Sequence, residues 1–405
     1  MISKITDHIF ETILIENNLC IFYQPIVSLD KEKVIGYEAL LRVQYENEPV
    51  HIENLFNYAR KSNRVKKLDY ASRELSLNSF CDARNDTILF LNFEASLLQE
   101  YMSNSNSILS FIKSLGIEYQ RIVIEINEKN ITNNDILLEF LELFRSEGFL
   151  IALDDVGAGY SNLNRIAIVK PDIVKIDRLV ISDIHKDYYK SEIVRAITSL
   201  SSKIGAITLA EGVETEEELC ACLSVGVSLF QGYYFSKAIP MQECLHLNYK
   251  NVFDMVSKKF KMNCIEDIKE RTGKGGARRE MLSEISLLLK ETSTNDYESV
   301  LLQYINQKDS IECVYVLDIN GMQLTPTIFK DRVPFRNNYL FSPSLKEDYH
   351  IVKPYYYVAM HKKHEVYISE KYISLATGNF CETYSITCKD LCDNDLIICL
   401  DFMVL

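Results

Sequence analysis

The feature that most constrains the fold is an alternation of short apolar runs with longer amphipathic stretches between Ile21 and about Gly232. Several of the short runs are apolar throughout, which is typical of strands buried on both faces. Helical stretches separate most of these runs, and this order predicts an α/β fold, a (β/α)8 barrel of the TIM type. The eight expected strands are Ile21–Val27, Val34–Val43, Ile88–Phe93, Arg121–Ile126, Phe149–Asp154, Ile173–Ile176, Ala206–Ala210 and Val227–Phe230.

The first two expected strands are joined only by Ser28–Lys33. This connection is too short for a crossover between parallel strands, so we expect one antiparallel strand pair in an otherwise parallel barrel. The expected helices of this region are Leu55–Phe80, Ala95–Ser114, Asn134–Ser146, Tyr188–Lys203 and Glu214–Ser224.

The sequence pattern changes after Pro240. A helix is predicted over Met241–Lys269, interrupted at Gly273–Gly276 and resumed over Arg278–Glu291. Strands follow, and Asn320-Gly321 is a strong signal for a hairpin turn. The sequence therefore predicts a barrel domain (1–248), a helical linker (249–291) and a smaller, mostly antiparallel α+β domain (292–405). The strands expected in that last domain are Val314–Ile319, Val366–Ile368, Glu382–Ile386 and Leu396–Phe402.

Composition indicates which partners the protein is not expected to bind and in which compartment it is expected to reside. The 405 residues carry a net charge of −13, which argues against binding of long nucleic acids. The 11 cysteines are an odd number and irregularly spaced, as expected of reduced thiols in the cytoplasm. A run of about 18 apolar residues is lacking, so we expect no membrane span.

Most of the predicted strands carry a polar residue at or near their C-terminal end. In a barrel these ends converge on one face, where active sites are built. Several carboxylates in one pocket repel each other unless cations are bound, and oxygen ligands favour Mg²⁺ or Mn²⁺ over zinc. Adjacent Asp154 and Asp155 can serve two ions, as in two-metal hydrolysis of a phosphodiester. The converging residues are Glu38, Asn92, Glu125, Asp154, Asp155, Lys175, Glu211, Glu214 and Gln231.

A set of motifs over about residues 5–245 resembles the EAL-domain family, in the family's own order. The resemblance implies a TIM-barrel phosphodiesterase that opens cyclic di-GMP to linear pGpG with two Mg²⁺ or Mn²⁺ ions, and a homodimer. The motifs are Tyr23-Gln-Pro-Ile26, Glu38-Ala-Leu40 with Arg42, Asp154-Asp-Val-Gly-Ala-Gly-Tyr-Ser161, Lys175-Ile-Asp177, Ala210-Glu-Gly-Val-Glu-Thr215 and Gln231-Gly232.

The same resemblance implies a role for each matching residue. Lys175 would hold or polarise the attacking water, and Glu211 would assist as a base or by way of a metal-bound water, with Glu38 and Asp155 also in the catalytic set. Glu128 would support the loop after Asp154. The implied metal ligands are Glu38, Asn92, Glu125, Asp154 and Asp155, and the implied contacts to cyclic di-GMP are Gln24, Leu40, Arg42, Glu214 and Gln231.

The C-terminal part resembles a PAS-like or Cache-like sensor domain. Its possible contacts to an unknown small-molecule ligand are Asp348, Lys353, Tyr355 and Tyr367. Lys353 stands where Cache domains often have Arg, and a lysine grips a carboxylate less firmly than the bidentate fork of an arginine. The alternative is that the aromatic residues of this segment serve core or dimer packing.

Three functions remain open from the sequence. The first is a metal-dependent cyclic di-GMP phosphodiesterase regulated by its C-terminal domain. The second is a catalytically weak cyclic di-GMP receptor that relays occupancy to a partner, and the third is another metal-dependent barrel enzyme acting on a phosphate ester. The complete set of acids, with Asn92 and Lys175, favours the first.

Overall fold

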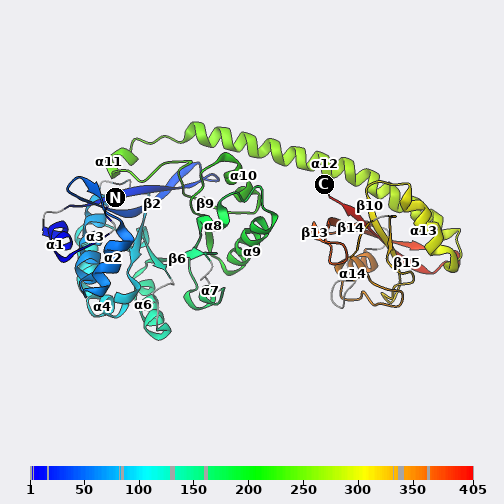
Figure 1. Ribbon diagram of the computed structural model, residues 1–405, viewed down its shortest axis with the longest axis horizontal. Helices are drawn as coiled ribbons and strands as arrows, with labels where there is room; N and C mark the ends of the chain where they lie inside the picture. Colours follow the sequence, from blue (N-terminus) through cyan, green and yellow to red (C-terminus); the bar gives the residue numbers. More distant parts are fainter. Residues whose placement is uncertain are drawn as a thin grey trace. The chain divides into compact units, whose positions relative to one another are not determined.

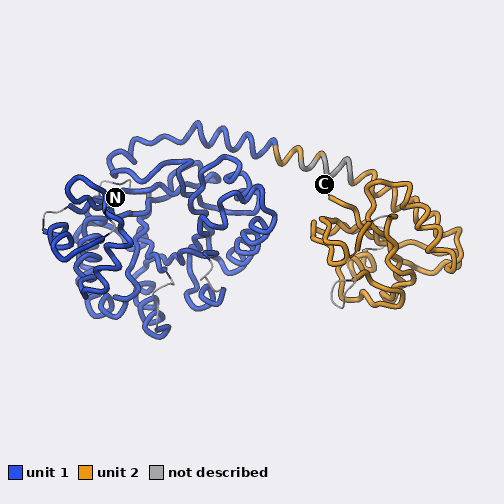
Figure 2. The backbone as a smooth tube through the Cα atoms, viewed as in Figure 1, with its two compact units in different colours: residues 1–262 blue, residues 263–405 orange. Residues whose placement is uncertain are grey.

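The computed structural model describes residues 2, 4–15, 18–81, 83, 86–127, 133–158, 163–331, 333–335, 342–362 and 365–404, with only the backbone at 267, 268 and 270–274. The chain forms two compact units, residues 1–262 and residues 263–405 (Figure 2). The three-part division into 1–248, 249–291 and 292–405 stays a prediction beside this description.

The first unit is a closed barrel of eight strands, as the sequence predicts (Figure 1). Strand β1 pairs antiparallel with β2 and with β9, and the other neighbouring strands of the barrel run parallel. A short ninth strand, β3 (Glu48–Pro49), pairs with the end of β2 outside the barrel. The barrel strands are β1 (Leu19–Ser28), β2 (Lys33–Tyr45), β4 (Ile88–Phe93), β5 (Ile122–Asn127), β6 (Leu150–Val156), β7 (Ile173–Ile176), β8 (Ile207–Ala210) and β9 (Leu229–Phe230).

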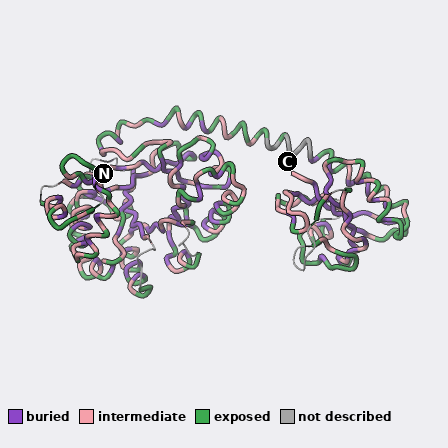
Figure 3. The backbone as a smooth tube through the Cα atoms, in the orientation of Figure 1, coloured by how far each residue is buried: buried purple, intermediate pink, exposed green. Residues whose placement is uncertain are grey.

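Helices surround these strands, and the buried residues follow the barrel wall (Figure 3). The segment expected as one helix over Leu55–Phe80 is two helices, because the chain turns at Asn63, which has a left-handed φ of 55°. The helices of this unit are α1 (Asp7–Ile15), α2 (Ile52–Lys61), α3 (Val65–Phe80), α4 (Leu98–Ser103), α5 (Ser105–Ser114), α6 (Asn134–Glu147), α7 (Leu163–Val169), α8 (Arg178–Ile181), α9 (Tyr188–Ile204), α10 (Glu216–Ser224) and α11 (Met241–Cys244), with 3₁₀ turns at Ala95–Leu97 and Tyr119–Arg121.

Two apolar clusters stabilise the barrel. The larger one lies between the strands and the surrounding helices, and includes Phe93, Phe140 and Phe144. The smaller one takes residues from seven strands and fills the interior. Its buried members are Ile26, Phe90, Val123, Ala152, Ile173, Leu209 and Leu229. This inner apolar layer forms the floor of the barrel mouth, and the polar residues at the strand ends lie directly above it.

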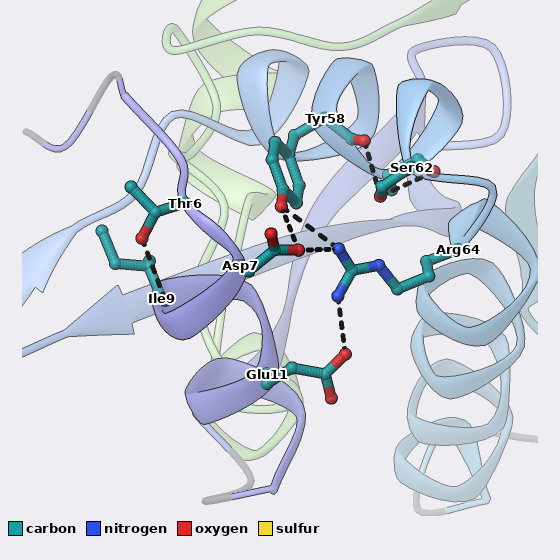
Figure 4. A network of polar contacts seen from close by, with 8 residues as sticks. Thr6, Asp7, Ile9, Glu11, Tyr58, Ser62 and Arg64 are labelled. Atoms are coloured by element: carbon teal, nitrogen blue, oxygen red, sulfur yellow. Dashed lines mark hydrogen bonds and ion pairs between the residues drawn. The ribbon is translucent and has the colours of Figure 1, made fainter.

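Helix α1 is attached to the barrel by a polar network centred on Arg64 (Figure 4). Arg64 pairs with Asp7 and, at 2.7 Å, with Glu11, while the Tyr58 hydroxyl donates to Asp7 at 2.6 Å. The hydrogen bonds to Tyr58 and Arg64 hold the pKa of Asp7 below its usual value. Because the carboxylates of this network face solvent, with the Asp7 side chain 80% exposed, we assign the network to the placement of α1 and give it little weight in stability.

The second unit contains a six-stranded antiparallel sheet, which confirms the predicted α+β class. The Asn320-Gly321 signal gives a tight turn with a φ of 79° at Gly321, but the hairpin beyond it is reduced to one bridge between Leu317 and Gln323. The strands, in sheet order, are β11 (Ile328–Phe329), β10 (Ile311–Asp318), β15 (Asp395–Met403), β14 (Phe380–Lys389) and β12 (Tyr367–Ile368), with β13 (Tyr372–Ile373) also on β14; the helices are α13 (Tyr297–Asn306) and α14 (Pro354–His361), with a 3₁₀ turn at Thr294–Asp296.

The long helix α12 (Lys250–Lys290) contributes to the cores of both units. Phe253 and Val256 belong to the barrel core, whereas Leu282 and Ile285 belong to the core of the second unit. The predicted interruption at Gly273–Gly276 is wrong, because the helix runs through these residues. Glycine weakens a helix by about 1 kcal/mol per residue relative to alanine, and packing of the flanking turns outweighs that cost.

Candidate active site

The predicted site residues stand one layer above the apolar floor of the barrel. Side chains two positions apart in a strand point to the same side, so each polar residue lies over a member of the inner cluster. Glu125 follows Val123 in this way, and Lys175 follows Ile173. The same spacing places Asn92 over Phe90, Asp154 over Ala152, Glu211 over Leu209 and Gln231 over Leu229.

Lys175 lies at the centre of this polar layer and is 1% exposed. Its Nζ is 2.6 Å from Glu125 Oε1, 2.7 Å from Glu211 Oε1, 3.0 Å from Asp154 Oδ1 and 3.7 Å from Glu38 Oε2. Four carboxylates from four different strands or strand ends therefore converge on one buried ammonium group.

Burial and charge shift the pKa values of this cluster in opposing directions. Burial alone would lower the pKa of Lys175, but the surrounding carboxylates reverse that effect and raise it well above its ordinary value. Burial raises the pKa of Glu125 well above its ordinary value and that of Asp154 to a lesser extent, and it raises the pKa of Glu211 to about 8. The cluster thus holds more negative charge than one lysine can compensate.

A chain of amide side chains fixes Glu38 on the opposite side of the barrel mouth. Gln231 Nε2 donates to Glu38 Oε2 at 2.6 Å and to Gln24 Oε1 at 3.0 Å, while Asn92 Nδ2 donates to Glu38 Oε1 at 3.3 Å. Gln24 Nε2 in turn donates to the Ser236 carbonyl at 3.0 Å. Both carboxylate oxygens of Glu38 are therefore oriented by amide side chains, one from β4 and one from the end of β9.

A strained backbone brings the adjacent acids Asp154 and Asp155 to the same site. The pairing of β6 with β7 shifts register between Leu153 and Val156, and Asp155 has a φ of 58°, in the left-handed region that non-glycine residues rarely occupy. Asn127 Nδ2 donates to Asp155 Oδ2 at 2.5 Å and helps to hold this conformation. Strain of this kind is typical of functional sites.

The donor set fits a divalent cation. Asp154, Asp155 and Glu211 each offer an oxygen, and these oxygens lie within 4.8 Å of one another. Glu125 is fully buried, and its Oε2 atom has no hydrogen-bond partner among the residues that the structure describes. A buried carboxylate oxygen without a partner costs free energy that a bound cation would offset. Hard cations such as Mg²⁺ and Mn²⁺ take such oxygen-only sets.

The remaining predicted substrate contacts lie around the barrel mouth, and two of them contact protein groups outside the acidic cluster. Leu40 and Arg42 follow Glu38 on the same face of β2, and Arg42 Nη1 donates to the Leu41 carbonyl at 2.9 Å. Glu214 pairs with Arg178 at 2.7 Å and is exposed. Glu128 lies outside the described residues. The sequence motifs assign no role to Arg178, which pairs with Glu214, or to Asn127, which holds Asp155.

In the second unit, three of the four predicted ligand contacts line one cavity. Lys353, Tyr355 and Tyr367 line a cavity of about 350 Å³. Asp348 is used differently, because its carboxylate accepts the Leu345 N–H at 2.7 Å and closes a turn. The residue missed by the sequence reasoning is Asp401, which lines the same cavity. A lone aspartate in the apolar run Leu396–Phe402 was the available signal.

Comparison with known proteins gives matches over both units. A sequence profile of the EAL domain matches residues 8–238. The Bacillus subtilis EAL-domain containing protein YkuI is 28% identical over 382 residues, 91% of each chain. The Escherichia coli cyclic di-GMP phosphodiesterase PdeR is 27% identical over 253 residues, which is 58% of this chain and 38% of PdeR. The chain therefore spans nearly all of YkuI but well under half of PdeR.

Solved structures give the same fold. The crystal structure of B. subtilis YkuI with substrate c-di-GMP and calcium superposes with a TM-score of 0.83 at 24% identity, and covers 99% of this chain and 100% of that one. Klebsiella pneumoniae BlrP1, in a manganese and c-di-GMP complex, gives a TM-score of 0.51 at 28% identity over 55% of this chain and 56% of its own. In the described part of the chain, every helix is too short or too polar to cross a membrane.

Proposed function

The chain belongs to the EAL-domain family, and on that premise we propose that its barrel hydrolyses cyclic di-GMP to linear pGpG with two divalent metal ions, Mg²⁺ or Mn²⁺. The observation that carries the proposal is the convergence of Glu38, Glu125, Asp154 and Glu211 on Lys175 at the barrel mouth. PdeR, which shares the family, is named as a cyclic di-GMP phosphodiesterase.

The negative charge of the mouth argues for cations in the mechanism. Cyclic di-GMP carries two phosphodiester groups, and a barrel mouth with five carboxylates and one lysine would repel it. We assign the two ions to Glu38, Asn92, Glu125, Asp154 and Asp155. When bound, such ions lower the pKa of water and neutralise charge on the attacking and leaving oxygens.

Of the residues that do not hold metal ions, some act on the attacking water and the others bind the substrate. Lys175 Nζ has three carboxylates within 3.0 Å, which fix the ammonium group at the barrel mouth. With the proposed ions bound to these carboxylates, one of its three N–H groups would be free to donate a hydrogen bond to the attacking water. Glu211, 2.7 Å from Lys175, lies where it can accept a proton from that water. The oriented amides Gln24 and Gln231 suit hydrogen bonding to the dinucleotide, as do Leu40, Arg42 and Glu214 around the rim.

Arg42 is the group best suited to a phosphate of the substrate. Its guanidinium makes one described hydrogen bond, to the Leu41 carbonyl, and carries five N–H donors in all. A bidentate contact to a phosphate uses two of the others. We further propose that the second unit regulates this activity, and that the protein acts as a homodimer in the cytoplasm.

The test is direct. Full-length protein is incubated with cyclic di-GMP and Mg²⁺ or Mn²⁺, and the products are separated by chromatography. The proposal expects linear pGpG with either ion and none in the presence of EDTA. Binding of cyclic di-GMP by calorimetry without any pGpG would instead identify a receptor, and the phosphodiesterase proposal would be wrong.

A further inference from the structure

The cavity of about 350 Å³ in the second unit contains a buried carboxylate with no cation of its own. Asp401 is 8% exposed and lies on β15, in the middle of the sheet. The Thr383 hydroxyl donates to its Oδ1 at 2.7 Å, and the Cys313 thiol contacts its Oδ2 at 3.5 Å. Among the described residues Asp401 has no ion-pair partner, so its charge rests on uncharged donors, the Thr383 and Tyr372 hydroxyls and the Cys313 thiol.

The electrostatic surroundings of Asp401 favour a cation. Glu312, a second buried carboxylate, lies on the neighbouring strand β10, and its partners among the described residues are the Thr377 hydroxyl and the Cys381 thiol. Burial raises the pKa of Asp401 to about 6, and the charge of Glu312 adds to that rise. The other charged residue that lines the cavity is Lys353, whose side chain is exposed and therefore belongs to the rim.

Aromatic rings form the walls of the same cavity. Tyr315 packs edge-on against Tyr355, with ring centroids 5.8 Å apart, and lies nearly parallel to His350 at 5.7 Å. Tyr372, whose hydroxyl hydrogen-bonds with Thr383 at 2.8 Å, and Phe329 complete the walls. The faces of tyrosine and phenylalanine rings attract organic cations through their quadrupoles.

A neutral histidine also lines the cavity. His350 is 5% exposed and lines the cavity. Its Nδ1 shares a 2.6 Å hydrogen bond with the Tyr355 hydroxyl, whereas its Nε2 has no hydrogen-bond partner among the described residues. Burial lowers the pKa of His350, so the ring is neutral at pH 7 and does not compete with a cationic ligand.

We propose that this cavity binds a small organic ammonium ion, a primary amine in its protonated form, with its N–H groups directed to Asp401 and its carbon chain between the aromatic rings. A volume of about 350 Å³ is at the lower end of ligand pockets, so the ligand is a small amine. The inference deepens the proposed regulation by the second unit, but binding can be measured without any phosphodiesterase activity, so the two proposals fail separately.

Isothermal titration calorimetry on the full-length protein tests the inference, with n-butylammonium and phenethylammonium chloride as probes. Butanol and butyrate are the matched uncharged and anionic controls. We expect binding of the ammonium ions alone, weakened at least about ten-fold by Asp401→Asn, because a charge-assisted hydrogen bond is lost. Glu312→Gln removes a buried carboxylate that does not line the cavity, so it should weaken binding less than Asp401→Asn does.

Two further variants keep the result decisive. Asp154→Asn controls for amine binding at the acidic barrel mouth and should leave the signal unchanged. Ala376→Phe fills the cavity from its rim, keeps Asp401 in place, and should abolish binding even if Asp401→Asn fails to fold. No heat from either ammonium ion, tighter binding of butyrate, or an ammonium signal that survives Ala376→Phe would overturn the proposal.

Discussion

The two units both bury carboxylates, and they stabilise them differently. At the barrel mouth, Glu125, Asp154 and Glu211 surround Lys175, which the chain itself provides. In the second unit, Asp401 is held by two hydroxyls and a thiol, all of them uncharged. The carboxylates at the barrel mouth carry more negative charge than Lys175 can neutralise, which favours binding of divalent metal ions. One buried carboxylate among aromatic rings instead favours a single organic cation.

Replacement of Asp154 tests the barrel half of this comparison and carries the largest expected effect. Asp154→Asn keeps the shape of the side chain and removes a charge proposed to serve both ions. We expect the rate of pGpG formation to fall by at least about a hundred-fold while folding is retained. Asp187→Asn is the control, because asparagine caps helix α9 as well as aspartate does. Undiminished pGpG production by Asp154→Asn would refute the metal assignment.

Lys175 and Arg42 should separate chemistry from binding. Lys175→Ala should lower kcat by about a hundred-fold with little change in affinity, because its role is on the water. Arg42→Ala should raise KM by about ten-fold, because it holds a phosphate in the ground and transition states alike. Steady-state kinetics and calorimetry with cyclic di-GMP measure the two effects, with exposed Lys259→Ala as the control. The reverse pattern would exchange the two roles.

The pH dependence of stability tests the second half of the comparison. The pKa of Asp401 is raised to about 6 from 3.8, so the native state binds this proton more tightly than the unfolded state. The free energy of unfolding should therefore fall as the pH rises from about 4 to 6, by at most about 3 kcal/mol from this group. Denaturant unfolding of wild type and Asp401→Asn at several pH values isolates this contribution. If the free energy of unfolding changed with pH in the same way in the wild type and in Asp401→Asn, the pKa of Asp401 would not be raised in the folded protein.

The smallest effect is expected in helix α12, which contributes to both cores. Among the described residues, a Cβ at Gly276 meets no atom outside the helix's own backbone within 4 Å, and one at Gly275 meets the Tyr384 hydroxyl at 3.8 Å. Alanine at both positions should raise the free energy of unfolding by about 1 kcal/mol each, as measured in denaturant. Destabilisation by these alanines would mean that the helix is interrupted at the glycines after all.

The two units also differ in how far the sequence predicts them. The barrel strands are continuous apolar runs with a polar residue at the end, so their order, the antiparallel pair and the residues of the mouth could be located. The sequence could not give the left-handed conformation of Asp155 or its contact with Asn127, because both depend on the register shift of β6. In the second unit, Asp401 meets Thr383 and Cys313 only through pairing of strands far apart in sequence.

Helix α12 shows a related limit. The sequence predicts an interruption of the helix at the glycines, yet Phe253 and Leu282 pack into apolar cores on either side of them. Helix propensity is local, whereas these contacts depend on tertiary packing. One practical consequence is that a truncated barrel should end at Met262, because a chain ending near Tyr249 would lose Phe253 and Val256 from its core.

We expect the barrel alone to carry the metal-dependent chemistry, which can be measured as pGpG formation by residues 1–262. The truncated and full-length proteins are compared with cyclic di-GMP and Mn²⁺, and again with EDTA. Because the barrel contains all the proposed catalytic residues, both proteins should form pGpG with Mn²⁺, at rates that can differ through regulation, and neither should form it with EDTA. A folded barrel that binds cyclic di-GMP and Mn²⁺ but yields no pGpG, while the full-length protein does, would contradict this expectation.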